Sequence, residues 1–167
     1  MPTRTDFTPD EWQAIRNAPQ LVAIATATAG NSGLFGSLSE GLATASTIAE
    51  AARGEHALLR EVFSKDEIRA AQEQIKALLK SATDKAALNS RLQQAATDSI
   101  PAALSALSSK GSAADVDAYR ALLKGVAEKV AKASTEGGFL GFGGERVSEG
   151  ERQFLSKLDA ALGHKAV

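Results

Sequence analysis

The sequence predicts an all-α protein: a single-domain bundle of six to eight helices around a central, nearly uncharged helical hairpin. Apolar residues recur at helical spacings of three and four, and no segment alternates apolar and polar residues as a half-buried strand would. Capping sequences precede several of the apolar segments. Helix-favouring Ala, Leu, Glu, Lys and Gln are frequent, whereas aromatic residues make up only 5% of the chain. These three observations favour helices and leave no segment for a sheet.

The length and charge of the chain limit what it can be. Its 167 residues fit one domain, with loose tails expected at residues 1–6 and 164–167. The sequence has no Cys, which excludes disulfides, thiolate metal sites and Cys nucleophiles and fits a cytoplasmic location. A net charge of −1 offers no basic field for nucleic acid. We expect neither a secretory signal nor a membrane-spanning helix.

The central hairpin is expected between Ala18 and Ala52. Its only charged side chains are Glu40 and Glu50, and almost all the others are small or aliphatic. The turn of the hairpin is placed at residues 29–33, which read AGNSG. A segment this apolar is suited to burial on all sides, so we expect it at the centre of the bundle.

The first helix has a clear start and an expected interruption. Thr8-Pro9-Asp10-Glu11 is a capping box with Pro at the first helical position, and Phe7 and Trp12 occupy the positions of a hydrophobic staple. Pro19 lacks a backbone donor and disfavours helical geometry in the residue before it. We therefore predict a break or kink near Asn17–Ala18.

Two further helices are expected between residues 55 and 80. The first is short, over residues 55–63, and the second opens at the capping box Ser64-Lys65-Asp66-Glu67. The apolar stripe of the second helix is Ile68, Ala71, Ile75, Leu78 and Leu79. Charges of both signs fill its other positions, which predicts a solvated face. These residues are Lys65, Asp66, Glu67, Arg69, Glu73, Lys76 and Lys80.

The C-terminal half reads as three more helical segments. Thr83 is the expected cap of the first, Pro101 is expected to bend or restart the chain, and residues 108–112 read as a loop. Capping sequences at Ser112–Asp115 and Ser148–Glu151 open the other two. The inward-facing residues are expected to be Leu88, Leu92, Ala95, Ala96, Tyr119, Leu122, Leu123, Val126, Val130, Phe154, Leu155, Leu158, Ala161 and Leu162. Among them, Leu122, Leu123, Val126, Leu155 and Leu158 are expected to form one buried cluster.

No catalytic residue, cofactor or metal site is predicted. His56 and His164 lie in no H-E-x-x-H or E-x-x-H pattern, and there is no G-x-S-x-G nucleophile elbow. Gly141–Gly144 lies near a helix start, but it lacks the preceding strand and the following Lys of a phosphate-binding loop. A turn is the favoured interpretation of these glycines.

A family resemblance begins at Lys132–Gly137 and continues through Val147–Glu151 to the final helix, with its Phe154-Leu155, Leu158 and Ala161–Gly163. This pattern resembles the tellurite-resistance TerB-like helical family, in which a V-S-x-x-E cap opens a closing helix that ends in A-L-G. It covers about the last quarter of the chain, Lys132–Gly163. The resemblance implies a stress-related, non-enzymatic helical protein.

The sequence departs from this family in the loop. The family's short acidic loops are associated with metal binding, whereas this loop contains no Asp. Only Glu136, Glu145 and Glu149 lie nearby, and calcium-type sites need six or more oxygen ligands. The resemblance therefore does not imply a metal site here.

The candidate interaction site is the loop Gly137–Gly144. It consists of Gly137, Gly138, Phe139, Leu140, Gly141, Phe142, Gly143 and Gly144. Its three large apolar side chains can plug the end of the bundle, or they can stand exposed and contact a protein, a second copy of the chain, or lipid. The general tendency of such groups to be buried favours plugging.

Three functions are carried forward. The leading hypothesis is a non-enzymatic soluble helical protein, an interaction or stress-related module with an unknown protein partner or a homo-oligomer. The alternative is a peripheral membrane protein that inserts the Gly/Phe-rich loops Gly33–Gly36 and Gly137–Gly144, although Arg146 and Lys132 are the only cations close to the second loop. An enzyme of unrecognised class is the second alternative.

Overall fold

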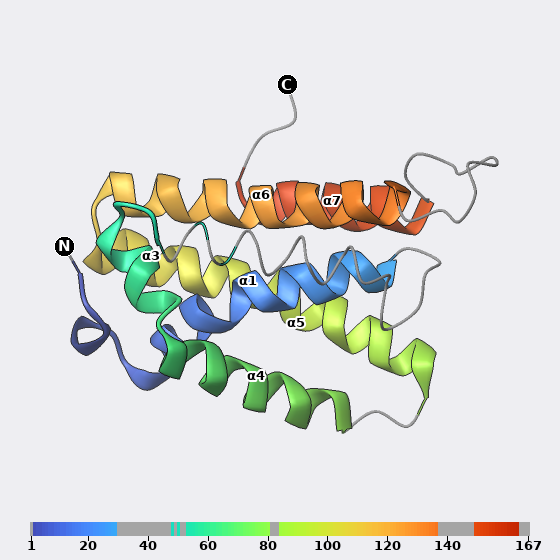
Figure 1. Cartoon of the computed structure of the whole chain (residues 1–167), viewed down its shortest axis with the longest axis horizontal. Coiled ribbons are helices and arrows are strands. Elements are labelled where there is room, and N and C mark those ends of the chain that lie inside the picture. The colour runs from blue at the N-terminus through green and yellow to red at the C-terminus, as the bar shows by residue number, and fades with distance from the viewer. Residues whose placement is uncertain are drawn as a thin grey trace.

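The computed structural model describes residues 2–29, 53–80, 84–136 and 149–163, together with Ile48 and Glu50. The described part is 88% helical and contains no strand, so the predicted all-α class is confirmed (Figure 1). Its elements are the 3-10 turn η1 (Arg4–Asp6) and the helices α1 (Pro9–Ala29), α3 (Ala57–Val62), α4 (Lys65–Lys80), α5 (Lys85–Lys110), α6 (Ala113–Glu136) and α7 (Glu149–Ala161).

Helix α1 is the centre of the bundle. It packs against α4, α5, α6 and α7, and Figure 1 shows α4 on one side of it and α6 on the other. The first arm of the predicted hairpin is therefore the C-terminal part of the core helix, with Ala18, Val22 and Ala25 fully buried, as is Ile15 before it. The predicted turn and most of the second arm lie outside the described residues. Of that arm, Ile48 packs against the core.

The start of α1 forms as predicted. The Thr8 N–H donates to the Glu11 carboxylate at 2.7 Å and the Glu11 N–H donates to the Thr8 hydroxyl at 3.3 Å, which completes the capping box. The rings of Phe7 and Trp12 lie 5.7 Å apart, centroid to centroid, as the staple requires. Residues 4–6, expected in a loose tail, instead form η1, closed by a 2.7 Å hydrogen bond from the Thr3 N–H to Asp6.

Of the break or kink predicted near Asn17–Ala18, the break is wrong and the kink stays a prediction. Helix α1 continues from Pro9 to Ala29 with Pro19 inside it. A proline at this position removes the N–H that would bond to the Ile15 carbonyl. The Tyr119 hydroxyl replaces that donor, because it donates to the Ile15 carbonyl at 2.6 Å from α6.

Helix α5 also differs from its prediction. Pro101 lies inside the helix, on its exposed face, and does not restart the chain, and residues 108–110 belong to the helix and not to a loop. The cap of α5 is Asp84, whose carboxylate accepts from the Ala87 N–H at 2.8 Å, in place of Thr83, which lies outside the described residues. Asp has the same capping chemistry as Thr, so the sequence left the choice between adjacent positions open.

The C-terminal helices meet α1 in one core. Leu122, Leu123, Val126 and Leu158 are buried in it, as predicted, while Leu155 is half-buried against it. Gly150 allows the first turn of α7 to approach the end of α1, because a Cβ at this position would collide with the main-chain carbonyl of Ala29.

Candidate ligand-binding groove

The interaction loop predicted from the sequence, Gly137–Gly144, lies outside the described residues. Its plugged and exposed alternatives therefore both stay predictions. Within the described part, the unusual chemistry lies elsewhere: a cluster of polar side chains between α1 and α4 has a buried centre, at Arg16, Asn17 and Glu67, and an exposed edge, at Gln13 and Gln74. We call it the polar network, and it consists of Gln13, Arg16, Asn17, Glu67 and Gln74.

A buried ion pair anchors the polar network. The Arg16 guanidinium lies 3.1 Å from the Glu67 carboxylate, and their side chains are 10% and 6% exposed. Arg4 reaches the other oxygen of the same carboxylate from η1 at 3.0 Å. Glu67 was predicted on the solvated face of α4, and this prediction is wrong. The carboxylate is buried because two guanidinium groups from outside α4 surround it.

Three amide side chains extend the network toward the surface. Arg16 donates to the Asn17 side-chain carbonyl at 3.2 Å and to the Gln74 side-chain carbonyl at 2.6 Å. The Asn17 amide nitrogen donates to the same Gln74 oxygen at 2.7 Å. The Gln74 nitrogen in turn donates to the Gln13 carbonyl at 3.1 Å. The network therefore joins α1 to α4 through a directed chain of hydrogen bonds.

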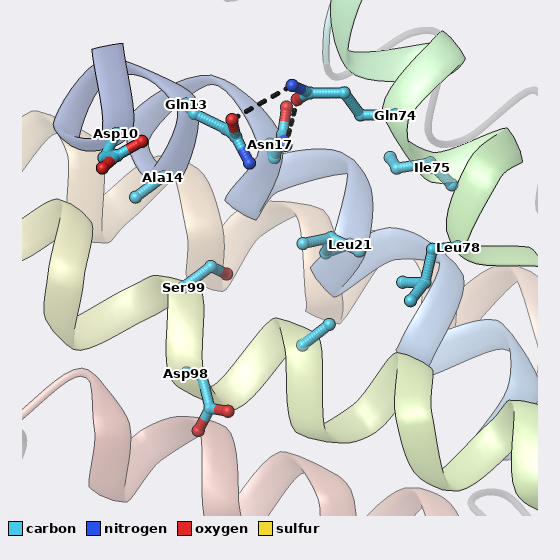
Figure 2. A pocket seen from close by; sticks show the side chains of 11 residues that line it. Asp10, Gln13, Ala14, Asn17, Leu21, Gln74, Ile75, Leu78, Asp98 and Ser99 are labelled. Carbon is cyan, nitrogen blue, oxygen red and sulfur yellow. Dashed lines mark hydrogen bonds between the residues drawn. The ribbon is translucent and has the colours of Figure 1, made fainter. Parts of the chain in front are cut away.

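Arg16 fixes the direction of this chain. A guanidinium group can only donate, so the Asn17 and Gln74 oxygens must both turn toward it. The Gln74 nitrogen is then the group that reaches Gln13, and the Gln13 oxygen must accept from it. Each of the three side-chain carbonyls thus accepts at least one internal bond, and the remaining polar hydrogens of the amides are free to donate to other groups. In Figure 2 the Gln13 nitrogen points to the other side from its bonded oxygen.

These donors border a groove of about 470 Å³ between α1, α4 and α5. Figure 2 shows Gln13, Asn17 and Gln74 converging at one part of it, with Leu21 and Leu78 farther along α1 and α4. The volume falls in the range of small-molecule sites, roughly 300–1,000 Å³. The floor is one face of α1, because its lining residues follow helical spacing. They are Asp10, Gln13, Ala14, Asn17 and Leu21.

The walls of the groove differ in chemistry. Ile75 and Leu78 of α4 and Ala95 of α5 add apolar surface to that of Leu21. Asp98 and Ser99 of α5 add polar groups, so that with Asp10 the lining contains two carboxylates. Among the described residues that line the groove there is no Lys or Arg. The groove thus combines an apolar region, amide donors and negative charge.

A smaller pocket of about 270 Å³ lies on the other side of the bridge between Gln13 and Gln74. Arg4, Trp12 and Arg16 line it together with those two amides. The indole nitrogen of Trp12 is buried and has no hydrogen-bond partner among the described residues. Both guanidinium groups that line this pocket are already paired with Glu67.

A second polar cluster joins α3 to α6 and contains His56, which the sequence singled out. His56 Nε2 lies 3.4 Å from one oxygen of Asp115, and the Ser112 hydroxyl and N–H both donate to the other oxygen at 2.7 Å. This is not a catalytic triad, because the hydroxyl donates to the carboxylate and not to the imidazole. Burial alone would raise the pKa of Asp115, but the Ser112 donors and the nearby His56 lower it below its ordinary value. The cluster caps α6.

No group of three or more potential metal-ligating side chains comes together within the described ranges. None of the helices in these ranges is long and apolar enough to cross a membrane.

Comparisons with known proteins find no relative of this chain. No family model matches it, and neither a curated protein nor a solved structure shows significant similarity to it.

Proposed function

We propose that this protein is a non-enzymatic binding module that holds a small organic ligand in the groove between α1, α4 and α5. One observation supports it above the others: the amide donors at the edge of the groove are held in a fixed orientation by the buried pair of Arg16 and Glu67. Polar groups that are oriented before a ligand arrives lose little freedom on binding.

The chemistry of the lining favours binding over catalysis. The side chains of Gln13, Asn17 and Gln74 are neither nucleophiles nor proton-transfer groups at ordinary pH, and amides that line a pocket can orient a ligand by hydrogen bonds. The apolar side chains beside them exclude water from part of a bound molecule. The resemblance of Lys132–Gly163 to the TerB-like family implies the same non-enzymatic class. The proposal includes a cytoplasmic location, which the Cys-free sequence favours.

The proposal is tested by screening a library of small polar and amphipathic molecules against the ¹⁵N-labelled full chain by NMR. We expect the binders to shift backbone amides that line the groove, such as those of Ala14, Leu21 and Ile75. The half-buried Ala95 lies on the α5 wall, so Ala95→Phe should fill the groove and abolish these shifts.

Ala102→Phe is the matched control, because it makes the same change on the exposed side of α5. Circular dichroism establishes that both variants are folded. The proposal is wrong if no molecule shifts groove amides, or if Ala95→Phe binds as well as Ala102→Phe.

A further inference from the structure

We infer that the ligand of the groove is a free α-amino acid with an apolar side chain. The inference rests on the proposed function and specifies its ligand. It follows from the groups that line one part of the groove: a carboxylate at Asp10, amide donors at Gln13 and Asn17, and apolar surface at Ala14 and Ile75. An apolar amino acid carries the three complementary groups on one carbon atom: an ammonium, a carboxylate and an apolar side chain.

The two carboxylates of the groove, Asp10 and Asp98, favour a positively charged group on the ligand. The Asp10 carboxylate has no hydrogen-bond or ion-pair partner among the described residues, and Asp98 accepts one hydrogen bond, from the Gln94 amide at 2.7 Å. With no Lys or Arg in the described lining, both carboxylates keep acceptor capacity for a ligand. A primary ammonium supplies three donors and the opposite charge, which makes it the simplest complement to this end.

The amide edge of the groove, formed by Gln13, Asn17 and Gln74, favours a hydrogen-bond acceptor on the ligand. The Gln74 oxygen accepts two internal bonds and the Gln13 and Asn17 oxygens accept one each, so the edge offers the ligand more free N–H groups than free oxygen lone pairs. The ion cluster beside it consists of the buried Arg16 and Glu67 and the exposed Arg4, and so carries one net positive charge. Both features favour a carboxylate over a neutral acceptor.

The spacing of these groups fits a single small molecule. Asp10 and Gln13 lie three residues apart on one helix face, where Cβ atoms are about 5–6 Å apart. Their side chains can therefore contact an ammonium and a carboxylate that share a carbon atom. Ala14 is next to Gln13 on α1 and Ile75 is next to Gln74 on α4, so a ligand side chain that starts at the amide edge meets their apolar surface first. Leu21 lies eight residues beyond Gln13, about 12 Å along the helix axis, and is out of reach of a leucine side chain.

Simpler ligands leave part of the groove unsatisfied. An alkylamine contacts the carboxylates but leaves the amide donors to water. An alkanoate contacts the donors but brings a third negative charge beside Asp10 and Asp98. Glycine satisfies both polar ends and leaves the apolar surface uncovered. An amino acid with an aliphatic side chain is complementary to all three regions.

The test compares L-leucine with its three partial analogues, 3-methylbutylamine, 4-methylpentanoate and glycine, by NMR titration of the full chain. We expect leucine to bind at least about tenfold more tightly than each analogue, with shifts at the groove amides. Two isosteric variants then change the polar groups of the groove one at a time. Gln13→Glu keeps an oxygen for the Gln74 bond but replaces the outward donor with a carboxylate oxygen. Asp10→Asn removes the charge that meets the ammonium.

Gln13→Glu should weaken leucine about tenfold or more and leave 3-methylbutylamine binding as strong or stronger. Asp10→Asn should weaken leucine and the amine and leave 4-methylpentanoate unweakened. Gln72→Glu and Asp66→Asn are the charge-matched controls, since both residues are exposed on α4 and outside the groove, and neither should change leucine binding by more than about twofold.

The possible failures are distinguishable. If molecules of the library shift the groove amides but leucine binds no more tightly than its analogues, or if Gln13→Glu and Asp10→Asn bind leucine like their controls, the amino-acid inference is wrong and the binding function stands. If neither leucine nor any library molecule shifts the groove amides, both are wrong.

Discussion

The Tyr119 hydroxyl donates a 2.6 Å hydrogen bond to the Ile15 carbonyl, the same carbonyl that Pro19 deprives of its helical donor. Tyr119 is fully buried and so is the carbonyl it meets, hence neither group has water as an alternative partner. One contact between α6 and α1 therefore satisfies two buried polar groups. It explains how the core helix continues through a proline.

This relationship predicts a coupling between Tyr119 and Pro19. Tyr119→Phe should lower the free energy of unfolding by about 1–3 kcal/mol, because it leaves the buried Ile15 carbonyl without a donor. In a Pro19→Ala background the new N–H of residue 19 can bond to that carbonyl, so the same change should cost less. Denaturant unfolding of the four proteins measures the difference, and equal costs in the two backgrounds would contradict the coupling.

The second prediction concerns the ionisation of Tyr119. Burial raises the pKa of its phenol far above the ordinary value of 10.0. The folded state therefore binds this proton more tightly than the unfolded state, and the stability that results is present below pH 10.0 and lost as the pH rises above it. Because the chain contains one Tyr, tyrosinate absorbance reports this residue alone. It should appear together with unfolding, measured by circular dichroism, and not before it.

The sequence predicted those features that neighbouring residues determine. Capping boxes at Thr8–Glu11 and Ser112–Asp115 and the apolar stripe of α6 depend on residues three or four positions apart, and they are confirmed. The break at Pro19 was predicted wrongly because the replacement donor, Tyr119, is 104 positions away. A propensity argument at residue 19 contains no information about a partner at that distance.

The groove was not predicted for the same reason. Gln13, Asn17 and Gln74 are common surface residues, and nothing in the sequence marks them as a set. The spacing of Gln13 and Asn17 at four positions places them on one face of α1, but Gln74 joins them from 57 positions beyond Asn17. Glu67 was likewise assigned to a solvated face because its partner Arg16 is 51 positions away. Only the packing of α4 on α1 brings these groups together.

The third prediction tests the buried ion pair. Glu67→Ala should lower the free energy of unfolding by about 3 kcal/mol or more, because it leaves the buried Arg16 guanidinium without its carboxylate. Glu73→Ala is the matched control on the same helix, since its carboxylate pairs with Lys76 at 3.0 Å but is 63% exposed. We expect little change in the control. Comparable losses in urea unfolding of the two variants would show that Glu67 contributes no more than a surface pair.

The last prediction concerns acid stability and Asp115, which is 2% exposed. Burial raises its pKa, but the Ser112 N–H, the Ser112 hydroxyl and His56 together lower it below the ordinary value of 3.8. A carboxyl whose pKa is lowered by folding stabilises the native state above its unfolded pKa, and this stabilisation is lost as the pH falls through the folded pKa. Asp115→Asn should therefore cost about 1–3 kcal/mol at neutral pH and progressively less in acid.

The matched control for Asp115 is Asp117→Asn, two residues farther along α6, whose side chain is 74% exposed. Thermal unfolding of the wild type and both variants, from neutral pH to below 3.8, separates them. The curves of the wild type and Asp115→Asn should converge as the pH falls, while Asp117→Asn follows the wild type throughout. The difference in unfolding temperature between the wild type and Asp115→Asn could instead stay constant across this range. Asp115 would then stabilise the fold through packing and hydrogen-bond geometry, and not through its charge.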